Sequence, residues 1–420
     1  MSKSAKPRGA AAKLELTGLP LDALSHVCYC LTLAHDIAVV GKSCRQMRAA
    51  ALNALKARPF TGEVVTLDGH GADVNCVAVA PGPLVLTGSD EFDIIMWRGG
   101  AKVNEILDAH KHRVWSLAVL PGGRFISVSQ DGDAKVWTLD GNLERTIKLA
   151  GCLYEVVCMP DGLHFVAAAG VIGDDDYGVV EVDDDDYDGE SNKVWLCHVD
   201  GTVVCTLDQA CGGHTRKVQA LAVTRDGRHI VSGSTDRLVK VWSVASQSLV
   251  STCGGHTGYI SDVVAMPDCQ RIISCSLDRS VKVWLLDGTL VKTIPELHDD
   301  TVRVLLPLPD NQHALSGSDD GTIKLFNVND GAVLRNFEHL HTECVRSLAL
   351  HPDGLRFVSG SFDNTACIVE HGLALAPTTT ASEIKVMVEG AETELRLAQE
   401  KVRLAEEKLR SLKQWLTTAK

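Results

Sequence analysis

One stretch decides the fold: it reads Gly213-His214, then Val231-Ser232-Gly233-Ser234-Thr235-Asp236, then Val239-Lys240-Val241-Trp242. Two further copies end at Trp284 and Phe326, each 42 residues after the previous one. The distance from the histidine to the final aromatic residue is 28 residues in all three copies. A unit that recurs every 40 to 45 residues indicates one small supersecondary element, repeated around an axis.

Further copies are found by working outward in both directions. Alternating stretches such as residues 239–242 predict half-buried strands, and Gly-Ser and Asp-Gly pairs predict the turns between them. Seven units result, and each ends in a tryptophan or an apolar equivalent. These positions are Trp97, Trp137, Trp195, Trp242, Trp284, Phe326 and Val369. We therefore predict seven four-stranded sheets.

A histidine and an aspartate recur in these units. We interpret them as buried pairs in which each side chain satisfies the other, because an unpaired polar group inside a sheet stack is costly. Repetition in several units also argues against a single catalytic relay. The residues assigned this structural role are His70, His110, His214, His256, His298, His341, Asp131, Asp236, Asp278, Asp320 and Asp363.

With these motifs, residues 61–372 resemble the WD-repeat β-propeller family. The resemblance implies an all-β, seven-bladed propeller that binds proteins. Three departures from the pattern occur: Glu91 replaces the turn aspartate in the first repeat, Val369 replaces the last tryptophan, and the third repeat, residues 149–195, lacks the histidine and carries an insertion. Residues 64–67 precede the first repeat, so we expect this strand to complete the last blade and close the ring.

Composition narrows the function. The net charge of −13 disfavours nucleic-acid phosphate as the general partner. The 14 cysteines have no metal-site spacing, and neither a nucleophile elbow nor a phosphate-binding loop is present. We therefore expect no catalytic residues, no metal and no cofactor. The absence of a secretory signal pattern or a membrane-spanning apolar run favours the cytoplasm, the nucleus or both.

The segment before the repeats has a different pattern. Residues 1–13 are expected to form a disordered tail, and residues 14–60 show helical spacing of apolar side chains. This segment resembles an F-box, the motif with which ubiquitin-ligase subunits bind a Skp-type adaptor. The residues that carry the resemblance, and that would contact the adaptor, are Leu19, Pro20, Leu24, Val27, Leu31 and Ile37. The alternative is a helical cap on the propeller.

The propeller face that would hold a client is predicted from position in the repeat. One residue in each innermost strand, and the residue before the turn aspartate, should lie at the same rim. The predicted client-binding residues are Asn75, Trp115, Tyr154, Gln219, Ser261, Arg303, Arg346 and Phe362. Trp, Tyr and Arg often dominate interface energies, and two neighbouring arginines could hold one phosphate or carboxylate.

Two remaining segments lie outside the regular repeat. Residues 173–190 contain ten Asp or Glu residues and no Lys or Arg, which predicts either a solvated loop or an acidic fence that selects basic clients. After a linker at residues 373–380, residues 381–420 carry apolar side chains at heptad spacing. This pattern predicts a helix that forms a homodimeric coiled coil or docks on the propeller.

Two functions are compatible with these features. The first is the substrate-recognition subunit of a cullin-RING (SCF-type) ubiquitin ligase, in which the propeller binds the client and residues 14–60 bind the adaptor. The alternative is a general WD-repeat scaffold protein of a multiprotein complex, without a link to ubiquitin transfer. Both functions are non-catalytic. In both, we expect the partners to be proteins, and we expect neither nucleic acid nor membrane to be bound.

Overall fold

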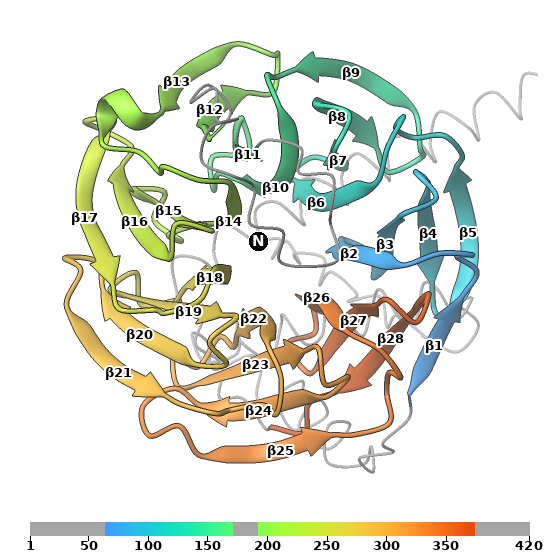
Figure 1. Cartoon of the computed structure of the whole chain (residues 1–420). Coiled ribbons are helices and arrows are strands. Elements are labelled where there is room, and N and C mark those ends of the chain that lie inside the picture. The colour runs from blue at the N-terminus through green and yellow to red at the C-terminus, as the bar shows by residue number, and fades with distance from the viewer. Residues whose placement is uncertain (1–63, 171–191, 374–420) are drawn as a thin grey trace, which may run out of the picture. The chain divides into compact units, whose positions relative to one another are not determined.

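The fold is a ring of seven four-stranded antiparallel sheets (Figure 1). The computed structural model describes residues 64–170 and 192–373, and all structural statements concern these residues. The predicted N-terminal helices, the acidic segment 173–190 and the C-terminal helix lie outside them. The seven-bladed all-β propeller is the architecture that the repeat spacing predicts.

The first three blades contain twelve strands in chain order. Blade 1 consists of β2 (Val74–Ala80), β3 (Leu84–Ser89), β4 (Ile94–Arg98) and β5 (Ala101–Ile106). Blade 2 consists of β6 (Val114–Leu120), β7 (Arg124–Ser129), β8 (Asp133–Thr138) and β9 (Leu143–Lys148). Blade 3 consists of β10 (Cys152–Cys158), β11 (His164–Gly170), β12 (Val194–His198) and β13 (Val203–Leu207).

The next three blades follow the same order after a short 3-10 helix, η3 (Gln209–Cys211). Blade 4 consists of β14 (Val218–Val223), β15 (His229–Ser234), β16 (Leu238–Ser243) and β17 (Ser248–Gly254). Blade 5 consists of β18 (Ile260–Ala265), β19 (Arg271–Ser276), β20 (Val281–Leu285) and β21 (Leu290–Ile294). Blade 6 consists of β22 (Val302–Pro307), β23 (His313–Ser318), β24 (Ile323–Asn327) and β25 (Val333–Phe337).

Blade 7 is built from both ends of the described chain. It consists of β26 (Val345–Leu350), β27 (Arg356–Ser361), β28 (Thr365–Glu370) and β1 (Val65–Asp68), and β1 takes the outermost place (Figure 1). The register pairs Val65 with Ile368 and Asp68 with Thr365 in antiparallel fashion. Residues 64–67 therefore close the ring as the sequence predicts, and blade 7 gains the strand that its own repeat lacks.

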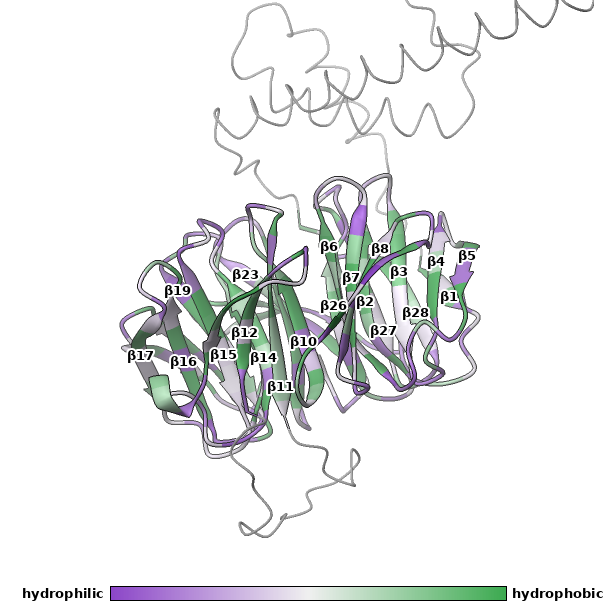
Figure 2. Cartoon of the chain, turned by 90° about the horizontal axis from the view of Figure 1, so that it is seen from above, coloured by the Kyte–Doolittle hydropathy of each residue, from purple (hydrophilic) through white to green (hydrophobic). Residues whose placement is uncertain are grey.

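The core lies between the blades, and the tryptophan position of each repeat packs against the preceding blade. Trp242 of blade 4 packs in one cluster with Val166 and Leu196 of blade 3. Trp284 of blade 5 likewise joins Val231 of blade 4. Apolar residues concentrate on the strands while the loops at both rims are more polar (Figure 2). A single blade cannot bury its faces alone, so the ring is the unit of stability.

The Ser-Gly-Ser motif of the repeat has a steric reason. A Cβ atom on Gly233 of β15 would come within 2.6 Å of Ile260, the first residue of β18 in the next blade. The equivalent Gly317 faces Val345 of the next blade at the same 2.6 Å. Glycine therefore lets the first strand of the following blade approach closely at these positions.

Candidate partner-binding face

The two rims of the ring differ. We call the end that carries the turns between the second and third strands, such as residues 235–237 of blade 4, the bulge-side rim. The end that carries the turns between the first and second strands, such as residues 224–228, is the opposite rim. We name the first rim after the β-bulges of the innermost strands, because these bulges lie at the same end as the turns between the second and third strands.

The loops of the bulge-side rim are fixed by a buried hydrogen-bond network. In blade 4, His214 Nδ1 lies 2.8 Å from Asp236, and His214 Nε2 lies 2.8 Å from Ser232 Oγ. The indole of Trp242 donates to the same hydroxyl at 2.9 Å. Asp236 also accepts from the backbone N–H groups of Thr215 and Leu238. The carboxylate thus joins the loop that enters the blade to the turn that connects its second and third strands.

The same His–Asp–Ser arrangement recurs in four other blades, as expected of a structural element of the repeat. In blade 2, His110 Nδ1 lies 3.1 Å from Asp131, and its Nε2 lies 2.7 Å from Ser127. Blades 5, 6 and 7 contain the corresponding pairs, with nitrogen–oxygen distances of 2.8, 3.0 and 2.9 Å. These pairs are His256–Asp278, His298–Asp320 and His341–Asp363.

The aspartates of these networks remain ionised. Burial alone would raise the pKa of the Asp131 carboxyl, but the hydrogen bonds from His110 and from the Lys111 backbone hold it below its usual range. The pKa of Asp236 is likewise lowered by His214 against the effect of burial. A charged acceptor makes stronger hydrogen bonds than a neutral one, which favours fixed rim loops.

Blades 1 and 3 depart from this network, at the repeats where the sequence departs from the pattern. In blade 1, Glu91 accepts from the Gly71 backbone at 2.8 Å, and His70 Nδ1 is buried with no partner among residues 64–170 and 192–373. Burial lowers the pKa of His70 to about 4. In blade 3, Ala167 stands opposite Trp195 as Ile230 stands opposite Trp242, so Ala169 takes the place of the Ser232 hydroxyl. Blade 3 therefore lacks the network.

Seven of the predicted client-binding residues occupy one equivalent position. Each falls where the register of the first strand shifts, as the extra residue of a β-bulge. Six of them are the second residue of that strand, and Tyr154 is the third residue of β10. A bulge redirects the side chain that it carries. These residues are Asn75, Trp115, Tyr154, Gln219, Ser261, Arg303 and Arg346.

Three of the seven side chains fasten neighbouring blades instead of facing outward. Ser261 donates to the Val302 carbonyl of the next blade at 2.6 Å. Gln219 donates to the Ile260 carbonyl at 2.5 Å. Asn75 donates to Asp90 at 2.7 Å and to Val114 of the next blade at 3.3 Å. Their side-chain donors are therefore used between blades, and whether these three residues contact a client stays a prediction.

The two predicted aromatic contacts are buried, which also corrects the expectation that they are exposed. Trp115 is 9% exposed and Tyr154 is 6% exposed. Their rings lie 5.8 Å apart between blades 2 and 3. Lys217 of blade 4 lies 3.5 Å from the Tyr154 ring centroid, and Arg346 of blade 7 lies 5.7 Å from that of Trp115. Side chains from four blades thus form one arc near the ring axis.

The two predicted arginines differ in their partners within the protein. Arg303 makes a bidentate ion pair with Asp319 of its own blade, with Nε–Oδ1 at 2.7 Å and Nη2–Oδ2 at 2.6 Å. This commitment leaves Arg346 as the arginine of the pair that is not bound to a carboxylate. Phe362, the remaining predicted contact, is half-buried at the bulge-side rim and takes part in contacts within the protein.

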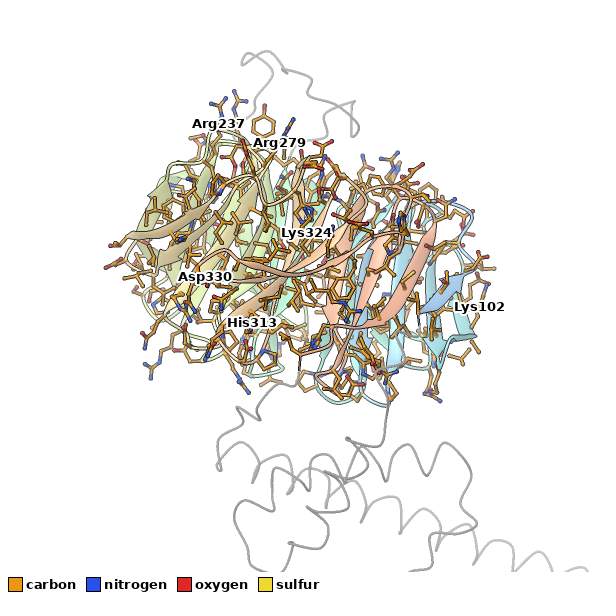
Figure 3. All side chains as sticks on the ribbon, turned by 90° about the horizontal axis from the view of Figure 1, so that it is seen from below. Lys102, Arg237, Arg279, His313, Lys324 and Asp330 are labelled. Carbon is orange, nitrogen blue, oxygen red and sulfur yellow. The ribbon has the colours of Figure 1, made fainter. Side chains whose placement is uncertain are left out.

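Two exposed arginines at the bulge-side rim were missed by the sequence analysis. Arg237 of blade 4 and Arg279 of blade 5 follow the turn aspartates, and Figure 3 shows both at one rim, away from His313. Their backbones are left-handed, with φ of 71° and 65°. A signal existed: Gly132, Gly321 and Asn364 occupy this turn position in blades 2, 6 and 7. Arginine at a position that suits glycine is strained, and such strain often marks functional residues.

Among residues 64–170 and 192–373, no group of three or more His, Cys, Asp or Glu side chains is arranged to hold a metal ion. No helix of this part of the chain is long and apolar enough to cross a membrane. The predicted adaptor-binding residues Leu19, Pro20, Leu24, Val27, Leu31 and Ile37 lie outside the described residues, so their role stays a prediction.

Comparison with known proteins identifies the repeat. The family model "WD domain, G-beta repeat" matches residues 62–98, 101–138, 201–243, 247–284, 288–327 and 331–370. The protein belongs to the WD-repeat family. The matched segments cover more than half of the chain, and none of them covers β10, β11 or β12 of blade 3, the blade without the network.

Curated relatives of this WD-repeat protein share part of its length. Cilia- and flagella-associated protein 52 of Homo sapiens is 25% identical over 193 residues, which are 44% of this chain and 27% of that protein. The protein of the same name from Chlamydomonas reinhardtii is 31% identical over 155 residues, or 35% of this chain and 21% of that protein. The match thus spans about a quarter of the length of these relatives.

Proposed function

We propose that this WD-repeat protein is a non-catalytic scaffold that holds partner proteins on its bulge-side rim. The observation that carries the proposal is the rim itself: charged hydrogen-bond networks fix its loops, and Arg237 and Arg279 stand exposed on it in strained backbone conformations. Backbone strain at an exposed arginine is explained if a partner protein binds the arginine side chain.

The names of the relatives suggest where the scaffold works. Because the matched relatives are cilia- and flagella-associated proteins, we propose that this protein belongs to a ciliary or flagellar assembly. A tagged full-length chain, expressed in ciliated cells, should then fractionate with detergent-insoluble axonemes. Recovery in the detergent-soluble fraction alone would contradict this assignment and leave the scaffold proposal in place.

Affinity purification of the full chain tests the scaffold. The double variant Arg237→Gly with Arg279→Gly removes both rim cations while relieving backbone strain, so it should fold and lose at least one partner that the wild type captures. The matched control is Arg228→Gly, which removes an exposed arginine from the opposite rim. An identical set of partners for wild type and double variant would overturn the proposed binding face.

The ubiquitin-ligase function is a second candidate, motivated by the F-box-like pattern that includes Leu24 and Ile37. It predicts that the wild-type chain binds a Skp-type adaptor directly and that Leu24→Asp with Ile37→Asp abolishes this binding. The variant should leave partners of the bulge-side rim unaffected. No adaptor binding by wild type would remove this candidate and retain the scaffold.

A further inference from the structure

The arc of four side chains near the ring axis contains a buried donor without an acceptor. The indole Nε1–H of Trp115 has no hydrogen-bond partner among the described residues, and Trp115 is only 9% exposed. In blades 1, 2, 4 and 5 the indole of the third-strand tryptophan donates to a hydroxyl group. An unpaired buried N–H is costly, which points to an acceptor supplied from outside the chain.

A second unused donor lies beside the first. The guanidinium of Arg346 is partly buried against the face of Trp115, and it makes no hydrogen bond or ion pair with the described residues in the structure. Its neighbour Arg303 is held by Asp319 and cannot compete for the same ligand. Arginine presents several N–H groups in a fixed plane, which suits a carboxylate.

An unused acceptor completes the set. Asn75 donates both to Asp90 and to the carbonyl of Val114, the residue before Trp115. Its own Oδ1 is buried and has no donor in the described part of the chain. Arg346 lies over the Trp115 ring, and Asn75 bonds to the residue before Trp115. Two donors and one acceptor that have no partner among the described residues therefore come from neighbouring side chains. An acidic residue in an extended peptide carries the complementary groups, since its side chain accepts and its backbone N–H donates.

The charged groups around Arg346 favour a ligand that carries one negative charge. Burial, and then the Asp262 carboxyl, raise the pKa of Glu155 to about 8, and burial raises the pKa of Asp262 to about 7. Near neutral pH these carboxyls are substantially protonated, so they compensate Arg346 only in part. A doubly charged phosphate would add a second negative charge beside them, whereas a carboxylate adds one.

We propose that Arg346 and the indole N–H of Trp115 bind the side-chain carboxylate of an Asp or Glu residue in an extended segment of a partner protein, whose backbone N–H donates to Asn75. The inference deepens the proposed scaffold function and rests on it. It gives the ring a central contact point that recognises one acidic residue, in addition to the exposed arginines at the rim.

The test uses the full chain with fluorotryptophan incorporated and fluorine NMR as the readout. The resonance of Trp115 is assigned by its disappearance in Trp115→Phe. The probes are three capped tripeptides with central glutamate, glutamine or phosphoserine between glycines. The glutamate peptide should shift the Trp115 resonance with saturation and leave the blade tryptophans unchanged.

Variants of Arg346 define the charge requirement. Arg346→Gln should lower the affinity for the glutamate peptide by about tenfold or more. Arg346→Lys should lower it by less, since lysine keeps the charge but lacks the planar guanidinium. The matched control is Arg335→Gln, which removes another arginine that lies over an aromatic ring, at 4.7 Å from Phe337 on the outermost strand β25. Unchanged blade resonances verify that each variant is folded.

Three outcomes would overturn the inference. They are a Trp115 resonance that does not move, equal shifts with glutamate and glutamine, and tighter binding of the phosphoserine peptide. If these occur while the Arg237 and Arg279 variant still loses partners, the carboxylate site fails and the scaffold stands. If the Arg237 and Arg279 variant keeps all partners, the proposed scaffold function fails independently of the carboxylate site.

Discussion

Blade 4 and blade 3 have the same four-stranded architecture but are held by different means. In blade 4 a charged network joins His214, Asp236, Ser232 and Trp242, whereas blade 3 has Ala169 in the place of Ser232 and no such network among its described residues. Both tryptophans nevertheless pack in the cluster shared with the preceding blade. The comparison indicates that apolar packing between blades specifies the blade, while the network fixes the loops of the bulge-side rim.

Removal of the packing should have the largest effect, and it should be similar in the two blades. Trp242→Ala and Trp195→Ala are each expected to lower the free energy of unfolding by about 3–5 kcal/mol, because each leaves a large cavity. Urea unfolding of the two variants measures the effect. Trp242→Phe is the matched control and should cost about 1 kcal/mol, since Phe326 occupies this place in blade 6. A much smaller loss of stability for Trp195→Ala would contradict the claim that apolar packing specifies both blades.

Removal of the network should cost less, and only where the network exists. Asp236→Ala leaves His214 and the backbone N–H groups of Thr215 and Leu238 without their acceptor. We expect a loss of about 2–3 kcal/mol in urea unfolding. The control is Asp226→Ala on the opposite rim of the same blade, where the carboxylate is more exposed and should contribute less than about 1 kcal/mol. Equal losses would show that the network has no special role.

Some of this division could be predicted from the sequence. The spacing of His214 and Trp242 predicts the blade, and the extra strand at residues 64–67 predicts the closure of the ring, because both depend on local periodicity. The fate of the bulge residues could not be predicted in this way. Whether Ser261 faces solvent depends on the carbonyl of Val302 in the next blade, which is a contact between repeats.

Arg303 and Arg237 show what the sequence could and could not predict about the arginines. The pairing of Arg303 with Asp319 depends on how two strands place their side chains, so the sequence suggested a free cation where the structure has an ion pair. Arg237, in contrast, could have been found by aligning it with Gly132 and Gly321 of other repeats. A turn that uses glycine in one repeat requires the same backbone conformation in the next.

The pH dependence should separate the two blades by the sign of their effects. Hydrogen bonds lower the pKa of Asp236 against burial, so its stabilising contribution is present above the usual carboxyl pKa of about 4 and is lost as pH falls below it. The pKa of Glu155 in blade 3 is raised to about 8, mainly by burial. The folded state then holds a proton that the unfolded state has lost, so stability declines as pH rises from about 4 to about 8.

Two single substitutions measure these opposite slopes. Asp236→Asn should reduce the loss of stability in acid and leave the decline toward pH 8 unchanged. Glu155→Gln should do the reverse, with a flatter profile between about pH 5 and pH 8, since the variant side chain does not titrate. Urea midpoints across this range provide the measurement. Parallel profiles for the Glu155 variant and wild type would contradict the raised pKa.

The smallest effect should be a gain in stability at the bulge-side rim. Arg237 has a left-handed backbone with φ of 71°, so Arg237→Gly should raise the free energy of unfolding by about 0.5–1 kcal/mol as strain is relieved. The matched substitution Arg228→Gly, at an exposed arginine next to the left-handed Gly227, should lower stability by about 0.5–1 kcal/mol because glycine adds only chain entropy there. Thermal unfolding of both variants resolves the opposite signs. If Arg237→Gly gains stability while partner capture declines, the strained arginine is kept for binding; a loss of stability would remove the strain argument for this rim.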